Sequence, residues 1–110
     1  MTDTKIIPTI PPEIEAKRAE IVALCQRFGV VQLDMFGSST IGGFDPETSD
    51  YDFIIDLGAY APGIARRFFG FEEALQSLLG RPVDLNAEPN GRNPYYMEAV
   101  AESRISFYEP

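Results

Sequence analysis

The sequence predicts a small α+β domain in which one β-sheet is backed by helices. The chain has 110 residues, which is the usual size of one domain. Apolar residues make up 45% of the chain, which is enough material for a core. Segments with apolar residues three and four positions apart alternate with short apolar segments, and this alternation is typical of helices interleaved with strands.

Three segments have the apolar spacing of a helix. The first is followed directly by Gly29, the type of residue that ends a helix. The second keeps its period despite an internal glycine, and a further glycine follows it. The third can begin at Pro94, because proline fits the first turn of a helix. The predicted helices are residues 13–28, 64–79 and 94–101.

Four short apolar segments are predicted to be strands. They are residues 30–36, 51–57, 83–86 and 105–108. Between the first two strands, residues 37–49 contain three glycines, three serines, two threonines and one proline. This composition predicts a loop.

The predicted elements define the domain organisation. Residues 1–12 hold three prolines without a sustained period and are predicted to form an extended N-terminal arm. Residues 13–110 are predicted to form one domain, and residues 88–93 are expected to be a turn-prone linker within it.

Composition excludes several classes of function. The chain has no histidine, which excludes Ser-His-Asp and Cys-His catalysis and nearly all catalytic zinc sites. Its net charge of -8 opposes binding to a phosphate backbone, so free nucleic acid is not an expected partner. The single cysteine, Cys25, lies in an apolar pattern and is expected to pack in the core. We find neither a signal-type segment nor an apolar run of membrane-spanning length, and therefore expect a cytoplasmic protein without a membrane partner.

Three aspartates are candidates for a metal site. Asp50 and Asp52 flank one residue at the start of a predicted strand, so both carboxylates project from one face. Asp84 interrupts another apolar strand, and it would approach the pair if the two strands are neighbours. Carboxylates without imidazole or thiolate favour Mg²⁺ or Mn²⁺, and three of them can hold two ions. The alternative is that these are ordinary solvent-facing acids. Asp56, at the strand end, is better explained as a turn residue.

A glycine and serine turn precedes these acids. Gly37 and Ser38 follow a predicted strand, and small residues there let backbone N–H groups approach phosphate oxygens. By itself this pair is weak evidence, because most such pairs form ordinary turns. This turn lies a dozen residues before the paired aspartates. The spacing would put phosphate donors and metal ligands at neighbouring strand ends.

The motifs together resemble the minimal nucleotidyltransferases of the DNA polymerase beta-like superfamily. The run GSSTIGGFDPETSDYD is similar to the signature of that superfamily, VDL resembles the strand that supplies a third carboxylate, and NPYYMEAVAESRISFYEP resembles the family's last helix and strand. The resemblance covers residues 14–108. It implies the nucleotidyltransferase fold, a single minimal domain with a small mixed β-sheet backed by helices on one side.

The resemblance also implies roles for individual residues. Asp50 and Asp52 would ligate both of two expected Mg²⁺ ions, with Mn²⁺ as a possible substitute. Asp84 would act as a base or as a ligand of the catalytic metal, so all three aspartates are the expected catalytic and metal-binding residues. Gly37, Ser38 and Ser39 would bind the triphosphate of ATP, the expected substrate.

Minimal members of this family often pair with a helical HEPN partner and act as antitoxins that attach AMP to a partner tyrosine. We therefore expect a metal-dependent transfer of AMP from ATP to such a partner, in a hetero-oligomer. Two alternatives stay open, which are a non-catalytic binding module and nucleotidyl transfer to a small molecule or an RNA end. The chain departs from the family in its spacer of 11 residues between Ser38 and Asp50, and in lacking basic residues directly after Ser38. The lack of basic residues there and the acidic surface motivate the binding module.

The sequence leaves open whether several aromatic residues are buried in the core or contact a partner. Phe68, Phe69 and Phe71 lie in one predicted helix and cannot all face one core, and Tyr95 and Tyr96 are also adjacent. Burial in the core is the simpler expectation, and contact with a partner is the alternative.

Overall fold

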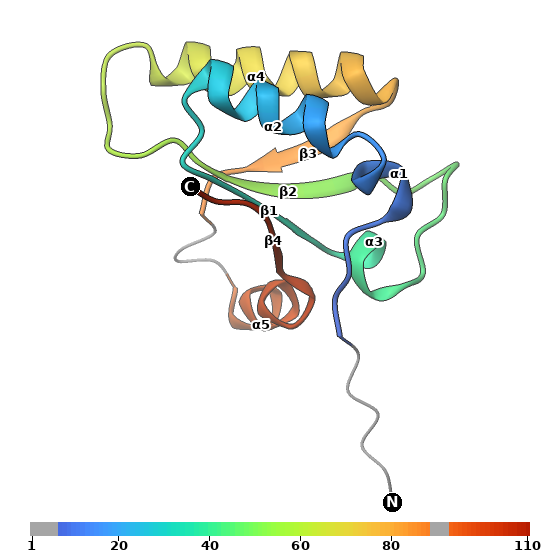
Figure 1. Cartoon of the computed structure of the whole chain (residues 1–110). Coiled ribbons are helices and arrows are strands. Elements are labelled where there is room, and N and C mark those ends of the chain that lie inside the picture. The colour runs from blue at the N-terminus through green and yellow to red at the C-terminus, as the bar shows by residue number, and fades with distance from the viewer. Residues whose placement is uncertain (1–6, 89–92) are drawn as a thin grey trace, which may run out of the picture.

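The computed structural model describes residues 7–88 and 93–110, which form one sheet with helices against both of its faces (Figure 1). The elements in chain order are α1 (Pro12–Glu15), α2 (Arg18–Phe28), β1 (Gln32–Phe36), α3 (Ser38–Ile41), β2 (Tyr51–Asp56), α4 (Ile64–Leu79), β3 (Val83–Asn86), α5 (Pro94–Ser103) and β4 (Ile105–Tyr108). The prediction of an α+β domain is confirmed.

The sheet is mixed, as predicted, with its four strands in the order β3-β2-β1-β4. β1 runs antiparallel to both β2 and β4, whereas β2 and β3 are parallel. In the parallel pair Asp52 lies opposite Asp84, and in the antiparallel pair Asp52 lies opposite Phe36. The register therefore brings the end of β1 and the starts of β2 and β3 to the same end of the sheet.

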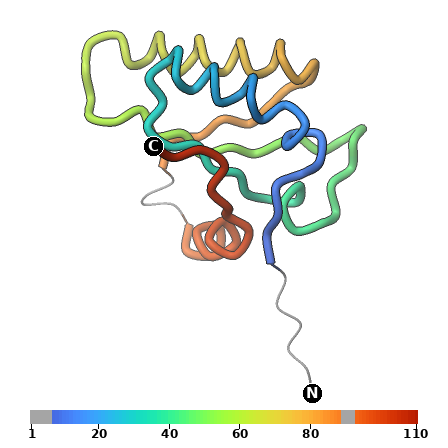
Figure 2. Tube along the Cα trace, in the orientation of Figure 1, coloured from blue at the N-terminus to red at the C-terminus, as the bar shows by residue number. Residues whose placement is uncertain are grey.

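The main core lies between the sheet and the helices α2 and α4, which run side by side over one face (Figures 1 and 2). Leu33, Met35 and Phe53 point from the strands into this layer and are fully buried. Gly70 lies where the helices meet, because a Cβ there would come within 2.8 Å of the Phe28 ring. The glycine inside the predicted helix is thus explained by close helix packing, and that helix has the predicted bounds.

The opposite face of the sheet is covered by α5 (Figure 1). Phe36 and Ile54 project onto this face and form a second small core with Val100, against which Tyr96 packs. The expected one-sided helical layer describes α2 and α4, and α5 is an addition to it on the other face. The physical reason is that β1 and β2 each place a large apolar side chain on that face, and α5 removes both from water.

Some boundaries differ from the prediction. The helix predicted at residues 13–28 is divided between α1 and α2, although Ile14 before the break and Ile21 after it are both fully buried. The predicted loop 37–49 begins with one helical turn, α3. The last helix extends to Ser103, two residues beyond the prediction. Residues 1–6 of the predicted arm and residues 89–92 of the predicted linker lie outside the described residues.

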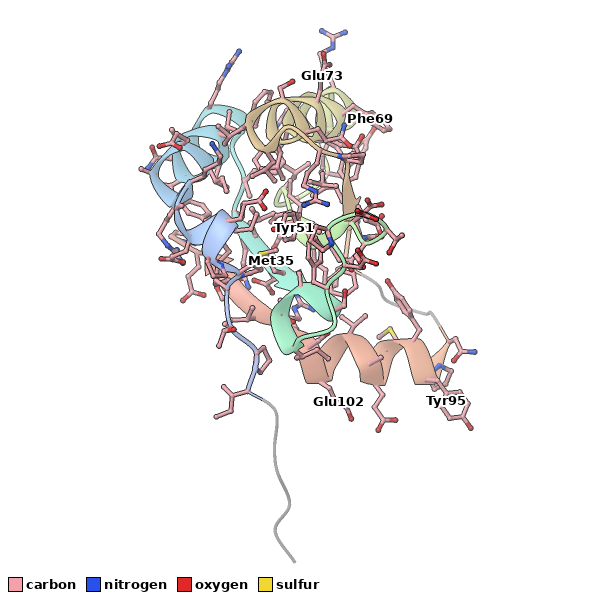
Figure 3. All side chains as sticks on the ribbon, turned by 90° about the vertical axis from the view of Figure 1, so that its right-hand side faces the viewer. Met35, Tyr51, Phe69, Glu73, Tyr95 and Glu102 are labelled. Atoms are coloured by element: carbon pink, nitrogen blue, oxygen red, sulfur yellow. The ribbon has the colours of Figure 1, made fainter. Side chains whose placement is uncertain are left out.

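The aromatic residues divide between the core and the surface. Phe71 is fully buried and Phe68 packs partly against the core, whereas 62% of the surface of Phe69 is exposed. Tyr95 is 83% exposed, and Figure 3 shows Phe69 and Tyr95 at the periphery, on α4 and α5 respectively. Cys25 is fully buried, which confirms its packing role. Among the described residues, no helix combines the length and apolar character needed to cross a membrane.

Candidate active site

Two of the three predicted aspartates meet in the parallel strand pair. Asp52 in β2 and Asp84 in β3 are register partners, and their carboxyl groups are joined by a hydrogen bond. Asp84 is exposed on β3, which is an outer strand of the sheet, and Asp52 is half-buried beside it. Asp50 lies directly before β2 and is exposed. The sequence therefore predicted correctly that strand pairing brings Asp84 to Asp52.

The pKa of Asp52 reflects its burial beside other acids. Burial raises the pKa of Asp52 first, followed by the hydrogen bond to Asp84, the charge of Asp84 and the charge of Asp50. Together they raise the pKa of Asp52 from 3.8 to about 7. Below about pH 7 the neutral form of the Asp52 carboxyl group is therefore favoured.

Gly37 connects the turn after β1 with this carboxyl group. Its backbone has φ 84° and ψ -165°, a conformation that is essentially restricted to glycine. A Cβ at this position would overlap the Oδ2 atom of Asp52. Glycine is therefore required twice, by the backbone conformation and by the approach of Asp52.

The turn is held in place by the last turn of α5. The N–H of Gly37 donates to the hydroxyl of Ser103 at 2.8 Å, and that hydroxyl donates to the carbonyl of Ala99 at 3.0 Å. The hydroxyl of Thr40 donates to the carbonyl of Ser103 at 2.7 Å and also lies 2.9 Å from the carbonyl of Gly37. Thr40 and Ser103 are both 2% exposed, so this small network is shielded from water.

These contacts decide which donors the turn can offer to a phosphate. The amide of Gly37 is already used by Ser103. The first amides of a helix have no partner within the helix, so the N–H groups of Ser38 and Ser39 at the start of α3 are the available ones. The hydroxyl of Ser39 is buried and, within the described part of the chain, has no hydrogen-bond partner.

The donor set fits a divalent cation in its chemistry. Carboxylate oxygens are the ligands that Mg²⁺ and Mn²⁺ prefer, and the raised pKa of Asp52 shows that negative charge here lacks compensation. Within residues 7–88 and 93–110, however, no three acidic, histidine or cysteine side chains already stand as a closed metal-binding group. Asp52 and Asp84 turn their carboxyl groups toward each other, and Asp50 acts on Asp52 through its charge. A bound cation would favour the ionised form of Asp52 and so lower its pKa.

Asp56 is not part of this group. It lies at the other end of β2, opposite Gln32, and its Oδ1 atom accepts a hydrogen bond of 2.8 Å from the N–H of Gly58. This is the turn role that the sequence predicted for it.

Comparison with known proteins assigns this arrangement to a family. The nucleotidyltransferase domain family matches residues 21–107 of the chain. The chain belongs to the nucleotidyltransferase family. It is 33% identical over 93 residues to a protein of Methanocaldococcus jannaschii named "Putative protein adenylyltransferase", and the match covers 84% of this chain and 90% of the relative. The resemblance found in the sequence is thereby confirmed, and the protein is a nucleotidyltransferase enzyme.

Solved structures share the fold of this nucleotidyltransferase. One described as "Structure of putative minimal nucleotidyltransferase" has a TM-score of 0.65 at 31% identity, covering 88% of this chain and 95% of the other. A chain from the complex of tri-AMPylated Shewanella oneidensis HEPN toxin with MNT antitoxin has a TM-score of 0.55 at 15% identity, covering 87% and 72%. A chain from a toxin-antitoxin structure with AMP-PNP has a TM-score of 0.60 at 17% identity, covering 84% and 73%. The last two show likeness of fold.

The sequence did not indicate every residue around the site of this nucleotidyltransferase. Ser103 and Thr40 shape the turn, and Arg81 contacts the loop before Asp50. Ser103 is 66 residues from Gly37, and no local spacing connects them. Arg81 stands two residues before the strand of Asp84, and a basic residue next to a strand that carries a candidate metal ligand is a signal that could have suggested a role.

Proposed function

We propose that this nucleotidyltransferase moves AMP from ATP onto a tyrosine of a helical HEPN-type partner and acts as the antitoxin of that partner. The contact of Asp52 with both Asp84 and the Gly37 turn carries the proposal, because it joins metal ligands to phosphate donors. The names of two similar proteins support the acceptor. One is a protein adenylyltransferase by name, and the other belongs to a complex with an AMPylated HEPN toxin. This chain and its HEPN-type partner would form a hetero-oligomer. The use of ATP fits a cytoplasmic location.

The chain would hold the nucleotide with the residues already described. Asp50 and Asp52 would bind two Mg²⁺ ions, with Mn²⁺ as a substitute, and Asp84 would complete the site. The N–H groups of Ser38 and Ser39 would bind triphosphate oxygens at the start of α3. When bound, the ions supply positive charge that balances the triphosphate and the departing pyrophosphate.

The transfer exchanges one phosphorus–oxygen bond for another. The tyrosine oxygen bonds to the α-phosphorus of ATP while the bond from that phosphorus to the bridging oxygen of the β-phosphate breaks. Pyrophosphate leaves with the electron pair, and the phenolic proton passes to the carboxylate of Asp84. Asp84 is suited to this role because it is exposed on an outer strand, where an acceptor side chain can reach it from solvent.

Transfer from labelled ATP tests the proposal. The purified protein is incubated with Mg²⁺, α-labelled ATP and a co-expressed helical partner, and we expect label on a partner tyrosine. Asp52→Asn should abolish labelling. Asp56→Asn is the matched control, because Asp56 lies on the same strand and binds Gly58 instead of the site. Absence of label on any partner, or full labelling by Asp52→Asn, contradicts the proposal.

A second candidate is that this nucleotidyltransferase neutralises its partner by binding alone, with exposed aromatic residues such as Phe69 and Tyr95 as contacts. The double variant Asp50→Ala, Asp52→Ala separates the candidates. Full neutralisation of the partner by that variant supports a binding role, and loss of neutralisation supports the enzyme. Label found on a small molecule or an RNA end in the same assay would identify the acceptor as something other than protein.

A further inference from the structure

Arg81 lies two residues before β3, and its guanidinium reaches across to the loop that leads into β2. Its Nη2 atom donates to the carbonyl of Pro46 at 2.6 Å and lies 3.4 Å from the carbonyl of Ser49. Ser49 is the residue directly before Asp50. Arg81 therefore connects the strand that carries Asp84 with the loop that carries Asp50.

The contacted loop is a small folded unit of its own. The N–H groups of Thr48 and Ser49 donate to the carbonyl of Asp45 at 3.2 and 2.8 Å. The carboxylate of Asp45 accepts from the N–H of Glu47 at 2.9 Å, and the hydroxyl of Ser49 accepts from the N–H of Asp45 at 3.1 Å. These bonds link residues 45 to 49 to one another, and Arg81 adds hydrogen bonds to this unit from outside it.

Arg81 is itself held firmly. The rings of Phe44 and Tyr51 stack with centroids 4.6 Å apart, and the guanidinium lies 5.1 Å from each centroid. Glu13 of α1 accepts a hydrogen bond of 2.9 Å from the hydroxyl of Tyr51 and pairs with Arg81 at 3.9 Å. Figure 3 shows Tyr51 in the middle of the molecule, in contrast to the peripheral Phe69 and Tyr95.

The three aspartates differ in what fixes them. Asp52 and Asp84 belong to paired strands, so the sheet register sets their positions. Asp50 precedes β2 and has no place in the register, so its position depends on the loop. We propose that Arg81 is a positioning residue that places Asp50 for metal binding, an inference that rests on the proposed function.

Stability alone does not explain this arginine. In the described residues its Nε atom is buried without a hydrogen-bond partner, and a buried unpaired donor is unfavourable. A lysine would keep the charge and remove that unpaired N–H. It would lose the planar group that lies against two rings while donating toward two carbonyls. Arg81→Lys therefore separates the positioning role from a need for positive charge.

Arg67 supplies a matched control. It also binds backbone carbonyls through its guanidinium, at 3.0 Å to Phe28, 2.8 Å to Gly29 and 3.2 Å to Leu57. These contacts lie at the ends of α2 and β2, away from the aspartates. Arg67→Lys therefore removes a comparable set of contacts without touching the loop before Asp50.

The experiment measures Mn²⁺ binding by electron paramagnetic resonance in the presence of a non-hydrolysable ATP analogue, together with amide hydrogen exchange at residues 47–51. For Arg81→Lys we expect Mn²⁺ binding weakened about tenfold, in line with the loss of a residue that orients a metal ligand. We also expect faster exchange at residues 47–51. Arg67→Lys should bind Mn²⁺ as the wild-type protein does.

Unchanged Mn²⁺ binding by folded Arg81→Lys overturns the inference, and so does equal weakening by both variants, which would indicate general destabilisation. Failure of the wild-type protein to bind Mn²⁺ with the nucleotide overturns the proposed function instead. If Arg81→Lys does not fold, Glu13→Gln takes its place, because it removes the charge that holds Arg81 and keeps an acceptor for Tyr51. Wild-type Mn²⁺ binding by Glu13→Gln would then overturn the inference.

Discussion

The N–H of Gly37 donates a hydrogen bond of 2.8 Å to the hydroxyl of Ser103, 66 residues further along the chain. This bond joins the turn at the end of β1 to the last turn of α5, and Asp52 contacts the same glycine. The position of α5 and the geometry of the candidate phosphate site are therefore linked. A substitution at Ser103 should therefore alter the geometry around the aspartates.

We predict that Ser103→Ala destabilises the protein and weakens nucleotide binding. The substitution leaves the N–H of Gly37 without its acceptor in a shielded place, which costs about 1–3 kcal/mol. Denaturant unfolding measures the first effect, and titration with an ATP analogue measures the second. Ser106→Ala, at an exposed position of β4, is the control. Equal stability of the two variants would contradict the role of this bond.

Gly37→Ala should abolish transfer. The new methyl group would strain the backbone by about 1–3 kcal/mol and push against the carboxyl group of Asp52. Gly43→Ala isolates the second effect, because Gly43 also has a positive φ of 88° but its Cβ would meet nothing within 4 Å. We expect both variants to lose stability and only Gly37→Ala to lose the labelling reaction. Retained labelling by Gly37→Ala would show that the approach to Asp52 is unimportant.

The stability of the protein in EDTA should depend on pH through Asp52. Its pKa is raised from 3.8 to about 7, so between these values the folded protein binds a proton that the unfolded chain does not. The free energy of unfolding therefore falls as the pH rises through this window and levels off above it. Asp52→Asn cannot titrate. Relative to wild type it should gain about 1–2 kcal/mol from low to neutral pH, a value reduced by the screening of a half-exposed group.

Asp45→Asn is the control for the same measurement. Hydrogen bonds from the backbone of Glu47 and the side chain of Thr48 lower the pKa of Asp45, so its ionised form stabilises the fold. That contribution is present above its ordinary pKa and is lost as the pH falls through its lowered pKa. Between about pH 5 and 8 the difference between Asp45→Asn and wild type should stay constant. A constant difference for Asp52→Asn over the same range would contradict the raised pKa of Asp52.

Arg104→Ala should be among the most destabilising single changes in the chain. The Nε atom of Arg104 donates to the carboxylate of Asp34 at 2.6 Å, and the Asp34 side chain is only 5% exposed. Removing the arginine leaves a buried carboxylate without its cation, at a cost of about 3–5 kcal/mol. Thermal and denaturant unfolding measure the loss.

Glu88→Gln is the control for Arg104. Glu88 binds the other side of the same guanidinium at 2.7 and 2.9 Å, but it is exposed. Exposed ion pairs contribute about 0–1 kcal/mol, so this variant should remain close to wild type. Comparable losses in Arg104→Ala and Glu88→Gln would show that the burial of Asp34 does not decide the effect.

Local sequence patterns predicted the bounds of one helix and two strands correctly. The helix at residues 64–79 and the strands at 83–86 and 105–108 have the predicted bounds, because apolar spacing and flanking glycine or proline specify them. The division of α1 from α2 and the extension of α5 to Ser103 were not predicted. The end of α5 is set by the contacts of Ser103 with Gly37 and Thr40, which a local period does not describe.

By itself the sequence determined that Asp50 and Asp52 alternate at the start of a strand, that a small-residue turn precedes them, and that Asp84 interrupts an apolar strand. Only the tertiary structure decided that Asp84 stands opposite Asp52, that Ser103 takes the amide of Gly37, and that Arg81 holds the loop before Asp50. The physical reason is that strand register and helix position place residues that are far apart in the chain. Those placements follow from the packing of the whole core, which no short run of residues encodes.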